Sequence, residues 1–318
     1  MSTRILVALV SMAVVLLVLI SRVDAPDSEP VVSDAPLLAS LNVAEIERID
    51  ITAGNNRHVV SLVQSDSSWT NEQSGYPANK TAVDQLLNTL STAQKTEAKT
   101  QLPEKYPLLG VADISNPDAG GLEFRINDGE VIIIAGYLND DGQYVRLSNS
   151  PQSWLIDAQF PDGRDTTDWL NTLLLDIPAA RIQRVRIVRP DNREPLALSK
   201  DSPEQLVFQT SDGSRSAAGS ALAALRFASV RKELSSNTPV SSAEFVTFDG
   251  LVVNTRTTEH ADGLLTTFSA AFSEEQNRTF AAEAAAAAVQ AEAAQINERL
   301  GGWAYTLDAR KNALLTGD

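Results

Sequence analysis

Cysteine is absent from the chain, and histidine is limited to His58 and His260 among 318 residues. Without cysteine the protein can form no disulfide, no thiolate nucleophile and no cysteine-ligated zinc or iron–sulfur centre. Two histidines exclude a multi-histidine metal site. The phosphate-binding glycine loops, the nucleophile elbow and the zinc-protease motif are missing as well. We therefore expect no cofactor and no metal, and we assign no catalytic residue.

Basic residues are the minority, with 26 Lys and Arg against 41 Asp and Glu, a formal charge of −15 and a pI of about 4.6. This balance argues against nucleic acid as a partner, because a phosphate backbone is bound by basic surfaces. The acidity is uneven: residues 41–178 hold nine basic and 20 acidic side chains, whereas residues 179–318 hold 15 and 17. The difference predicts two lobes with different surfaces.

One long apolar run is present, residues 5–20, and it contains no charge. As a helix it would be roughly 24 Å long, and adding residues 21–23 brings it near the ~30 Å core of a bilayer. We expect residues 1–23 to form a cytoplasmic tip and a transmembrane anchor. The alternative is a cleaved secretory signal, because residues 23–25 resemble a cleavage site, although Pro26 would follow the cut directly.

Charges beside the apolar run predict its orientation. Arg4 precedes the run, and Arg22 is soon followed by Asp24, Asp27 and Glu29. The positive-inside rule then leaves the N-terminus in the cytoplasm and exports the bulk of the chain. This arrangement is that of a single-pass protein of a bacterial inner membrane with its bulk in the periplasm. Residues 24–40, which hold three prolines and no periodicity, are expected to form a flexible stalk.

The first lobe is predicted over residues 41–178. Alternating aliphatic and polar residues at 46–51, a turn at 54–56 and a returning strand at 58–63 are followed by a helix that Asn79 caps. Residues 122–157 then contain about four strand-like segments separated by polar turns, which predicts an antiparallel meander.

Residues 165–175 are expected to form a short helix with Trp169 facing inward. We interpret Asp162, Asp165 and Asp168 as capping and turn residues, because they lack the spacing of a calcium-binding loop. Ser229 and Lys232 match the S-x-x-K spacing of some serine enzymes, but the companion motifs are missing, and we attribute the match to chance.

The second lobe, residues 179–318, repeats the opening of the first. Val185 and Ile187 occupy the places of Ile49 and Ile51, 136 residues later. A helix around Leu222 and Leu225, a second meander over residues 245–272, an alanine-rich helix over residues 280–300 and a closing strand at 303–307 are predicted to follow. The fold class is therefore α+β, with two related β-β-β-α plus antiparallel-meander lobes behind one N-terminal transmembrane helix.

Five arginines cluster at the start of the second lobe, namely Arg181, Arg184, Arg186, Arg189 and Arg193. Two interpretations remain open for this cluster. It is either a solvated strand face paired with acids on neighbouring strands, or a basic strip that meets the acidic first lobe or an anionic partner. This possible interaction strip is the candidate site that the sequence provides.

Several short motifs occur in a defined order along residues 46–315. They are the strand at 46–51, Tyr76-Pro77-Ala78, Leu109-Gly110-Val111, Ala135-Gly136, Tyr144-Val145-Arg146, Trp154-Leu155-Ile156, Trp169 ahead of Asp176-Ile177, and Gly302-Trp303-Ala304-Tyr305. Their order resembles that of the bacterial domain-of-unknown-function 4340 family. The alanine-rich helix is a departure from that pattern.

This resemblance implies a membrane-anchored protein often paired with ABC-type export systems similar to those of gliding motility, and it implies no catalytic residue. We expect a non-enzymatic periplasmic accessory subunit of such an export or cell-envelope complex, held at the inner membrane through residues 5–23 and contacting other membrane proteins. The alternatives are a periplasmic module that binds a small molecule or polysaccharide in a groove between the lobes, and an unrecognised hydrolase.

Overall fold

The computed structural model describes residues 32–66, 68–190, 194–205, 207–210, 217–233, 238–261, 263–280 and 286–317. The predicted anchor, residues 1–23, and residues 24–31 of the predicted stalk lie outside these ranges. Within the described ranges, no helix is both long and apolar enough to cross a membrane.

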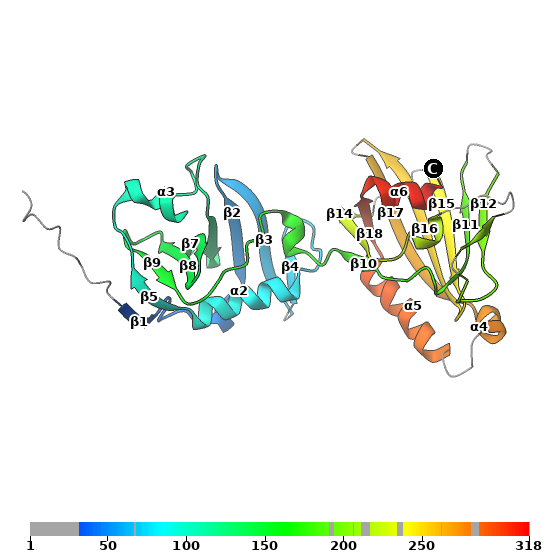
Figure 1. Ribbon diagram of the computed structural model, residues 1–318, viewed down its shortest axis with the longest axis horizontal. Helices are drawn as coiled ribbons and strands as arrows, with labels where there is room; N and C mark the ends of the chain where they lie inside the picture. Colours follow the sequence, from blue (N-terminus) through cyan, green and yellow to red (C-terminus); the bar gives the residue numbers. More distant parts are fainter. Residues whose placement is uncertain are drawn as a thin grey trace, which may run out of the picture.

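Two lobes lie side by side, each built on one nine-stranded antiparallel sheet (Figure 1). Sheet 1 has the order β1-β5-β9-β8-β7-β6-β2-β3-β4, and sheet 2 has the order β10-β14-β18-β17-β16-β15-β11-β12-β13. Adding nine to every strand number of sheet 1 gives the order of sheet 2. The two lobes therefore share one connectivity, and the predicted α+β class with two lobes is confirmed.

The strands of the first lobe are β1 (Val32–Pro36), β2 (Arg48–Ala53), β3 (Arg57–Ser65), β4 (Ser68–Asn71), β5 (Gln94–Ala98), β6 (Leu122–Ile126), β7 (Val131–Asn139), β8 (Gly142–Leu147) and β9 (Ser153–Ile156), and its α-helices are α2 (Lys80–Thr92) and α3 (Tyr106–Leu109). The strands of the second lobe are β10 (Leu173–Leu175), β11 (Ile182–Val188), β12 (Leu196–Ser199), β13 (Gln209–Thr210), β14 (Leu225–Lys232), β15 (Pro239–Thr247), β16 (Leu251–His260), β17 (Gly263–Phe272) and β18 (Trp303–Leu307), and its α-helices are α4 (Glu274–Phe280), α5 (Ala286–Leu300) and α6 (Ala309–Thr316).

Each sheet has an inner face, which packs into the main core of its lobe, and an outer face on the opposite side. Ile49 and Ile51 of β2 and Val185 and Ile187 of β11 are buried on the inner faces, while the residues between them point outward. This period of two is the alternation predicted for both segments, because successive side chains of a strand point to opposite faces. The cap of α2 is also confirmed, since the Asn79 side chain accepts from the N–H groups of Thr81 and Ala82.

Two predicted helices are wrong. Residues 165–175 form a 3₁₀ turn, Thr166–Trp169, and then strand β10, which pairs with β14 at the edge of sheet 2, ahead of the predicted lobe boundary at residue 178. The predicted helix around Leu222 and Leu225 is a 3₁₀ turn at Ala218–Ser220, and Leu225 opens β14. Both strands depend on a partner that is distant in the sequence, and their own composition does not reveal it.

Three further predictions change in detail. Residues 32–36 of the predicted stalk form β1, which pairs antiparallel with β5, and Leu37 is buried in the core. Of the predicted helix 280–300, residues 286–300 form α5 and Phe280 ends α4, while residues 281–285 lie outside the described chain. The inner face of sheet 2 is covered by α5 through Val289, Ile296 and Leu300, so no counterpart of α2 is required there.

Tyr76 joins the two lobes. It lies between β4 and α2 in the first lobe, yet its ring belongs to the core of the second and is 2% exposed. Its ring centroid is 5.2 Å from that of Phe227 and 5.1 Å from that of Trp303, both edge to face. The Tyr76 hydroxyl donates to the Asn171 carbonyl at 3.3 Å. The lobes therefore share an aromatic cluster, which opposes independent movement.

Replacement of Tyr76 by alanine should uncouple the lobes. Loss of a buried aromatic ring lowers the free energy of unfolding by about 3–5 kcal/mol. Most of the contacts that the Tyr76 ring makes are with the second lobe, so their loss weakens the attachment of the lobes to each other. We expect Tyr76→Ala to convert a cooperative urea transition into two separate ones, followed by near- and far-ultraviolet circular dichroism. Tyr76→Phe is the control, because it keeps the ring and removes one hydrogen bond worth about 1 kcal/mol. Equal behaviour of the two variants would contradict this role.

Candidate functional site

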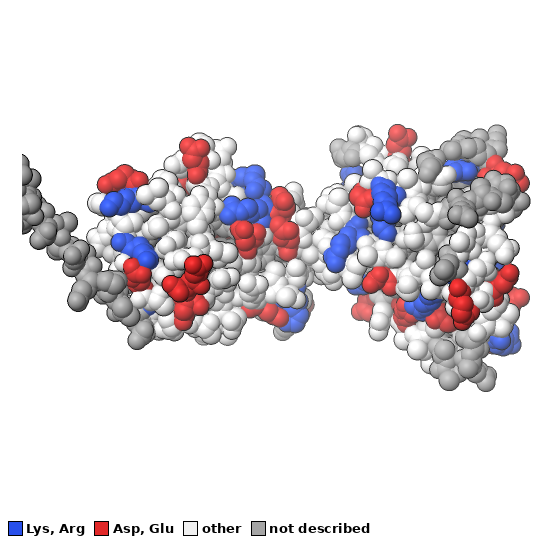
Figure 2. Space-filling view, in the orientation of Figure 1, with Lys and Arg blue, Asp and Glu red and all other residues white. Residues whose placement is uncertain are grey.

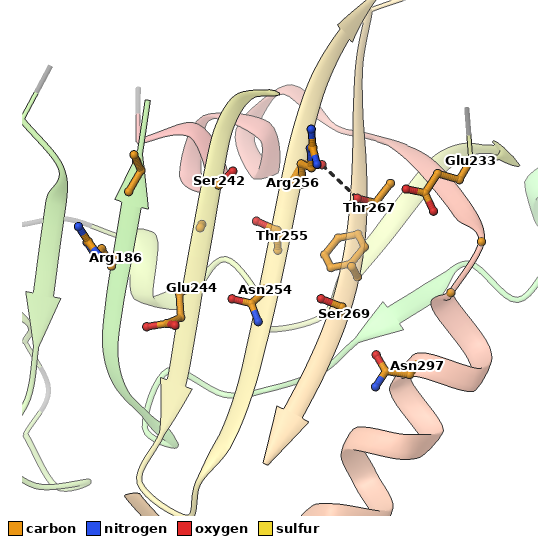
Figure 3. Close-up of a pocket in the computed structure, with 15 residues that line it drawn as sticks. Arg186, Glu233, Ser242, Glu244, Asn254, Thr255, Arg256, Thr267, Ser269 and Asn297 are labelled. Carbon is orange, nitrogen blue, oxygen red and sulfur yellow. Dashed lines mark hydrogen bonds between the residues drawn. The ribbon is translucent and has the colours of Figure 1, made fainter. Parts of the chain in front are cut away.

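The outer face of sheet 2 carries two polar rows that cross four strands. In one row Arg186, Glu244, Asn254 and Ser269 lie opposite one another on β11, β15, β16 and β17. In the next row the four strands supply Val188, Ser242, Arg256 and Thr267. Figure 3 shows the polar members of both rows on this one surface. The pairing register therefore places these side chains, which are up to 83 residues apart in the sequence, on one face of the sheet.

These rows form the floor of an open groove of about 580 Å³. One wall is the C-terminal end of α5, with Asn297, Gly301 and Gly302, and Glu233 lies beyond it at the end of β14. The floor offers hydroxyl and amide groups from Ser242, Asn254, Thr267 and Ser269, together with the charged ends of Arg186, Arg256 and Glu244. A surface of this composition suits a polar ligand that hydrogen-bonds along its length.

Asn297 fixes the wall of the groove to its floor. The Asn297 amide oxygen accepts from the N–H group of Ala270 on β17 at 2.8 Å, and its amide nitrogen donates to the Ala270 carbonyl at 2.7 Å. β18 pairs with β17 at Thr266 and Tyr305 and not at Ala270. The side chain therefore takes the place of a neighbouring strand, which satisfies two backbone groups that would otherwise be unpaired.

In the first lobe, the equivalent face is covered. Residues 99–121, here called the cover segment, connect β5 to β6 and include α3. Val111 and Ile114 of this segment form a small second core with Ile134 of β7, which is 1% exposed. Arg146 of β8 donates to the Val111 carbonyl at 3.0 Å and pairs with Asp113. The outer face of sheet 1 is thus closed by the chain itself.

The corresponding connection in the second lobe is short. β14 ends at Lys232 and β15 begins at Pro239, whereas β5 ends at Ala98 and β6 begins at Leu122. In sheet 2, β18, β17 and β16 lie between β14 and β15, and residues 234–237 of the connection lie outside the described residues. This connection has six residues, whereas the cover segment has 23.

The predicted arginine strip does not form one surface. Arg181 makes a bidentate pair with Glu292 of α5, at 2.8 and 2.6 Å, and also bonds Asp249. Arg184 lies 3.8 Å from Glu244, and Arg186 lines the groove. Arg189 donates to the Gly317 carbonyl at 2.6 Å, and Arg193 lies outside the described residues. Arg186 is therefore the one described member that belongs to the groove.

Electrostatics separates Arg181 from its neighbours on β11. Hydrogen bonding to Glu292, followed by hydrogen bonding to Asp249, raises the pKa of Arg181 against the opposing effect of its burial. The pair holds α5 against the start of β11 and the turn after β15. Its role is structural.

Other residues that the sequence singled out lie apart from the groove floor. Asp165 and Asp168 cap the 3₁₀ turn, where the Asp168 carboxylate accepts from the Asp165 N–H at 2.9 Å. The ammonium of Lys232 lies 3.6 Å from the Trp303 ring centre. Among the residues described, no three acidic or histidine side chains gather as a metal site.

Sequence reasoning missed the floor of the groove. Ser242 and Glu244 alternate with buried residues on β15, and Asn254 and Arg256 do so on β16. A continuous series of polar outward positions on strands 239–272 was the available signal. Charges of both signs are interspersed over the visible face of both lobes, so net charge did not point to this region (Figure 2).

The fold and the groove define a class: an α+β protein of two lobes with one connectivity, in which one outer sheet face packs against the cover segment and the other carries a polar groove. The family model described as "Domain of unknown function (DUF4340)" matches residues 69–243, which is more than half of the chain. The chain belongs to this domain-of-unknown-function 4340 family, and the resemblance seen in the sequence is confirmed. No curated protein and no solved structure shows a significant match.

Substitution of the two arginines should separate an internal contact from an exposed one. Arg181→Gln leaves Glu292 and Asp249 without their shared cation and should lower the unfolding free energy by about 1–3 kcal/mol. Arg184→Gln removes a long, exposed ion pair and should change it by less than about 0.5 kcal/mol. Urea unfolding checks both. An equal loss in the two variants would contradict the structural role of Arg181.

Removal of the Asn297 amide should loosen the groove wall. Asn297→Ala leaves the N–H and C=O groups of Ala270 without these partners, at a cost of about 1–3 kcal/mol in unfolding free energy. Asn254→Ala is the matched control, because its exposed amide lies on the floor and its loss should cost less than about 0.5 kcal/mol. Faster amide exchange at Ala270 in Asn297→Ala alone is the expected local signature. Unchanged exchange would show that α5 is held by its apolar face without Asn297.

Proposed function

We propose that this protein is a non-enzymatic accessory subunit of an ABC-type export or cell-envelope complex. In this proposal residues 5–23 anchor it in the bacterial inner membrane, and the two lobes stand in the periplasm. The long uncharged run at residues 5–20 and the charges beside it support the anchor. Membership of the domain-of-unknown-function 4340 family, together with the setting that the resemblance implies, supports the complex.

The polar groove that described residues form on the outer face of sheet 2 supports an interaction role. An antiparallel sheet commonly packs one face and leaves the other to solvent, so exposure alone is ordinary. Here the same face of the sister sheet packs against the cover segment, whereas the described residues of sheet 2 line a groove of about 580 Å³. We infer that the second lobe presents this face to a partner subunit.

A second candidate is a binding module for a small molecule or a polysaccharide. The hydroxyl and amide groups of Ser242, Asn254, Thr267 and Ser269 favour it, because sugars and polar metabolites are bound through such groups. The groove lies within the second lobe, whereas the sequence-based hypothesis placed a ligand between the lobes. A hydrolase would require carboxylates that converge, and Figure 3 shows Glu233 and Glu244 on opposite sides of the groove.

Isolation of the full chain from bacterial membranes tests the accessory role. After extraction in a mild detergent, we expect the protein to co-purify in fixed stoichiometry with components of an ABC-type transporter, identified by mass spectrometry. Alkaline phosphatase fused to the C-terminus should be active, because that enzyme requires export. Recovery of the protein alone under conditions that preserve other membrane complexes would count against the role. An inactive fusion would overturn the proposed orientation.

A further inference from the structure

Exposed apolar side chains gather on and beside the cover segment of the first lobe. Among the described residues, three of the seven large apolar side chains that are exposed lie here, namely Leu102, Leu108 and Tyr137. Leu108 of α3 is the most exposed of the seven, at 76%. A single exposed leucine is ordinary, but several large apolar side chains on one surface indicate an interaction surface.

Residues 99–110, here called the docking turn, are fixed to the lobe beneath them. The Tyr106 ring is buried, its hydroxyl donates to the Pro151 carbonyl at 2.6 Å, and the Arg146 guanidinium lies 4.6 Å from the ring centre. Leu108 follows two residues later in α3, and residues two apart in a helix lie on nearly opposite sides. The buried tyrosine therefore holds Leu108 outward in a fixed position.

Two lysines flank the exposed leucine. Lys99 and Lys105 line a shallow hollow of about 250 Å³ together with Leu108 and its neighbours. A lysine stem lies along apolar groups while its ammonium reaches a polar layer, as at a membrane interface. Lys99 also pairs with Glu97 at 2.5 Å, and Glu104 is exposed in the same turn. Insertion of leucine, more than net charge, must therefore supply the affinity of this surface.

Tyr137 extends the apolar surface from α3 onto β7. Its ring lies directly against Gly110, where even a Cβ would come within 3.0 Å of two ring carbons. The same ring lies against Gly120, where a Cβ would come within 2.7 Å of it. The two glycines therefore let an exposed tyrosine contact the cover segment. Tyrosine is typical of the headgroup layer of a bilayer, because its ring is apolar and its hydroxyl is polar.

The described chain enters the first lobe beside the docking turn. β1 is an edge strand of sheet 1 and pairs antiparallel with β5, with Val32 opposite Glu97. Lys99 follows Glu97 by two residues, so the start of β1 and the start of the docking turn lie at the same end of this strand pair. Figure 1 shows β1, β5 and α3 at the end of the first lobe that lies away from the second lobe.

The length of chain before β1 limits how far this end can lie from the proposed membrane span. If residues 5–23 cross the bilayer, nine peptide steps separate residue 23 from Val32, and they extend over at most roughly 30 Å. The end of the first lobe that carries the docking turn is then the end nearest the bilayer. Such a tether gives a high effective concentration, so a weak surface contact is sufficient for docking.

We propose that the docking turn rests on the periplasmic surface of the lipid bilayer. Leu102 and Leu108 enter the boundary between headgroups and acyl chains, Tyr137 lies at the headgroups, and the ammonium groups of Lys99 and Lys105 contact lipid phosphates. The inference rests on the proposed membrane anchor and adds the surface by which the first lobe contacts the membrane. Docking at this surface sets the height and orientation of both lobes above the bilayer, because Tyr76 joins them.

Absence of cysteine allows a single label to report this contact. The full chain is reconstituted in nanodiscs of phosphatidylethanolamine and phosphatidylglycerol, with an NBD fluorophore on Leu108→Cys. The same label on Arg278→Cys, an exposed position of α4 in the second lobe, is the control. Lipids with a doxyl group near the top of the acyl chain should quench the label at residue 108 and leave that at residue 278 unchanged. Equal quenching at the two positions would overturn the inference.

A second substitution separates insertion from mere proximity. In the chain labelled at residue 108, Leu102→Glu replaces a buried leucine of the docked state by a carboxylate and should lower the ratio of docked to undocked molecules at least about tenfold. Val207→Glu is the matched control, because Val207 of the second lobe is 49% exposed and Leu102 is 47% exposed. It should leave the quenching unchanged. Undiminished quenching in Leu102→Glu would show that leucine insertion does not hold the turn.

A protein occupant would give a different result. In that case the label at residue 108 is shielded only in nanodiscs that also contain the co-purified transporter components, and lipid quenching is absent. This outcome would overturn the lipid inference and assign the docking turn to the complex.

Alkaline carbonate extraction of vesicles separates the inference from the proposed anchor. A chain that resists extraction while residue 108 stays unquenched has the anchor without the docking. A chain that carbonate releases, although residue 108 was quenched, has the docking without the anchor. Resistance together with quenching is the expected result. Co-purification tests the accessory role independently, since neither measurement depends on transporter components.

Discussion

One constraint organises the molecule: each sheet must bury one apolar face, and its other face must be either covered or made polar. The inner faces are treated alike in both lobes, with aliphatic residues such as Ile51 and Ile187 in full burial. The outer faces differ, because the outward-facing residues of a strand can change from apolar to polar without disturbing the inward-facing core residues. The difference between the lobes follows from that freedom.

The connection from β5 to β6 and its counterpart from β14 to β15 differ in length. Residues 99–121 are long enough to fold back over sheet 1, and Ile134 beneath them is aliphatic and buried. Residues 233–238 are a much shorter connection, and the position that corresponds to Ile134 is occupied by Arg256. One shared connectivity thus supports two different outer faces, one packed against the cover segment and one that carries a polar groove. The aromatic contact of Tyr76 fixes sheet 2 to the first lobe.

The arginines near residue 181 show that proximity in the sequence is not enough to predict a shared site. Their sequence proximity predicted one strip, but the backbone distributes them among different contacts. Arg181 precedes β11 and binds acids of α5 and of the turn after β15, and Arg189 follows β11 and binds the end of α6. Arg186, in the middle of the strand, lines the groove together with residues of β15, β16 and β17. The sequence shows that residue 186 is an arginine. Its neighbours in the groove, however, are up to 83 residues away in the sequence, at Ser269.

By itself the sequence determined the strands of the first meander, part of those of the second, the capped helix after Asn79, the repeat of residues 46–51 at residue 181 and the family, because these depend on period, turn chemistry and motif order. Only the tertiary structure decided that residues 173–175 and 225–232 are strands, that the two sheets share one connectivity, and that polar residues of four strands line one groove. The reason is physical. Strand pairing and coverage of a face are relations between distant segments, and their free energy comes from contacts that a local window of sequence does not contain.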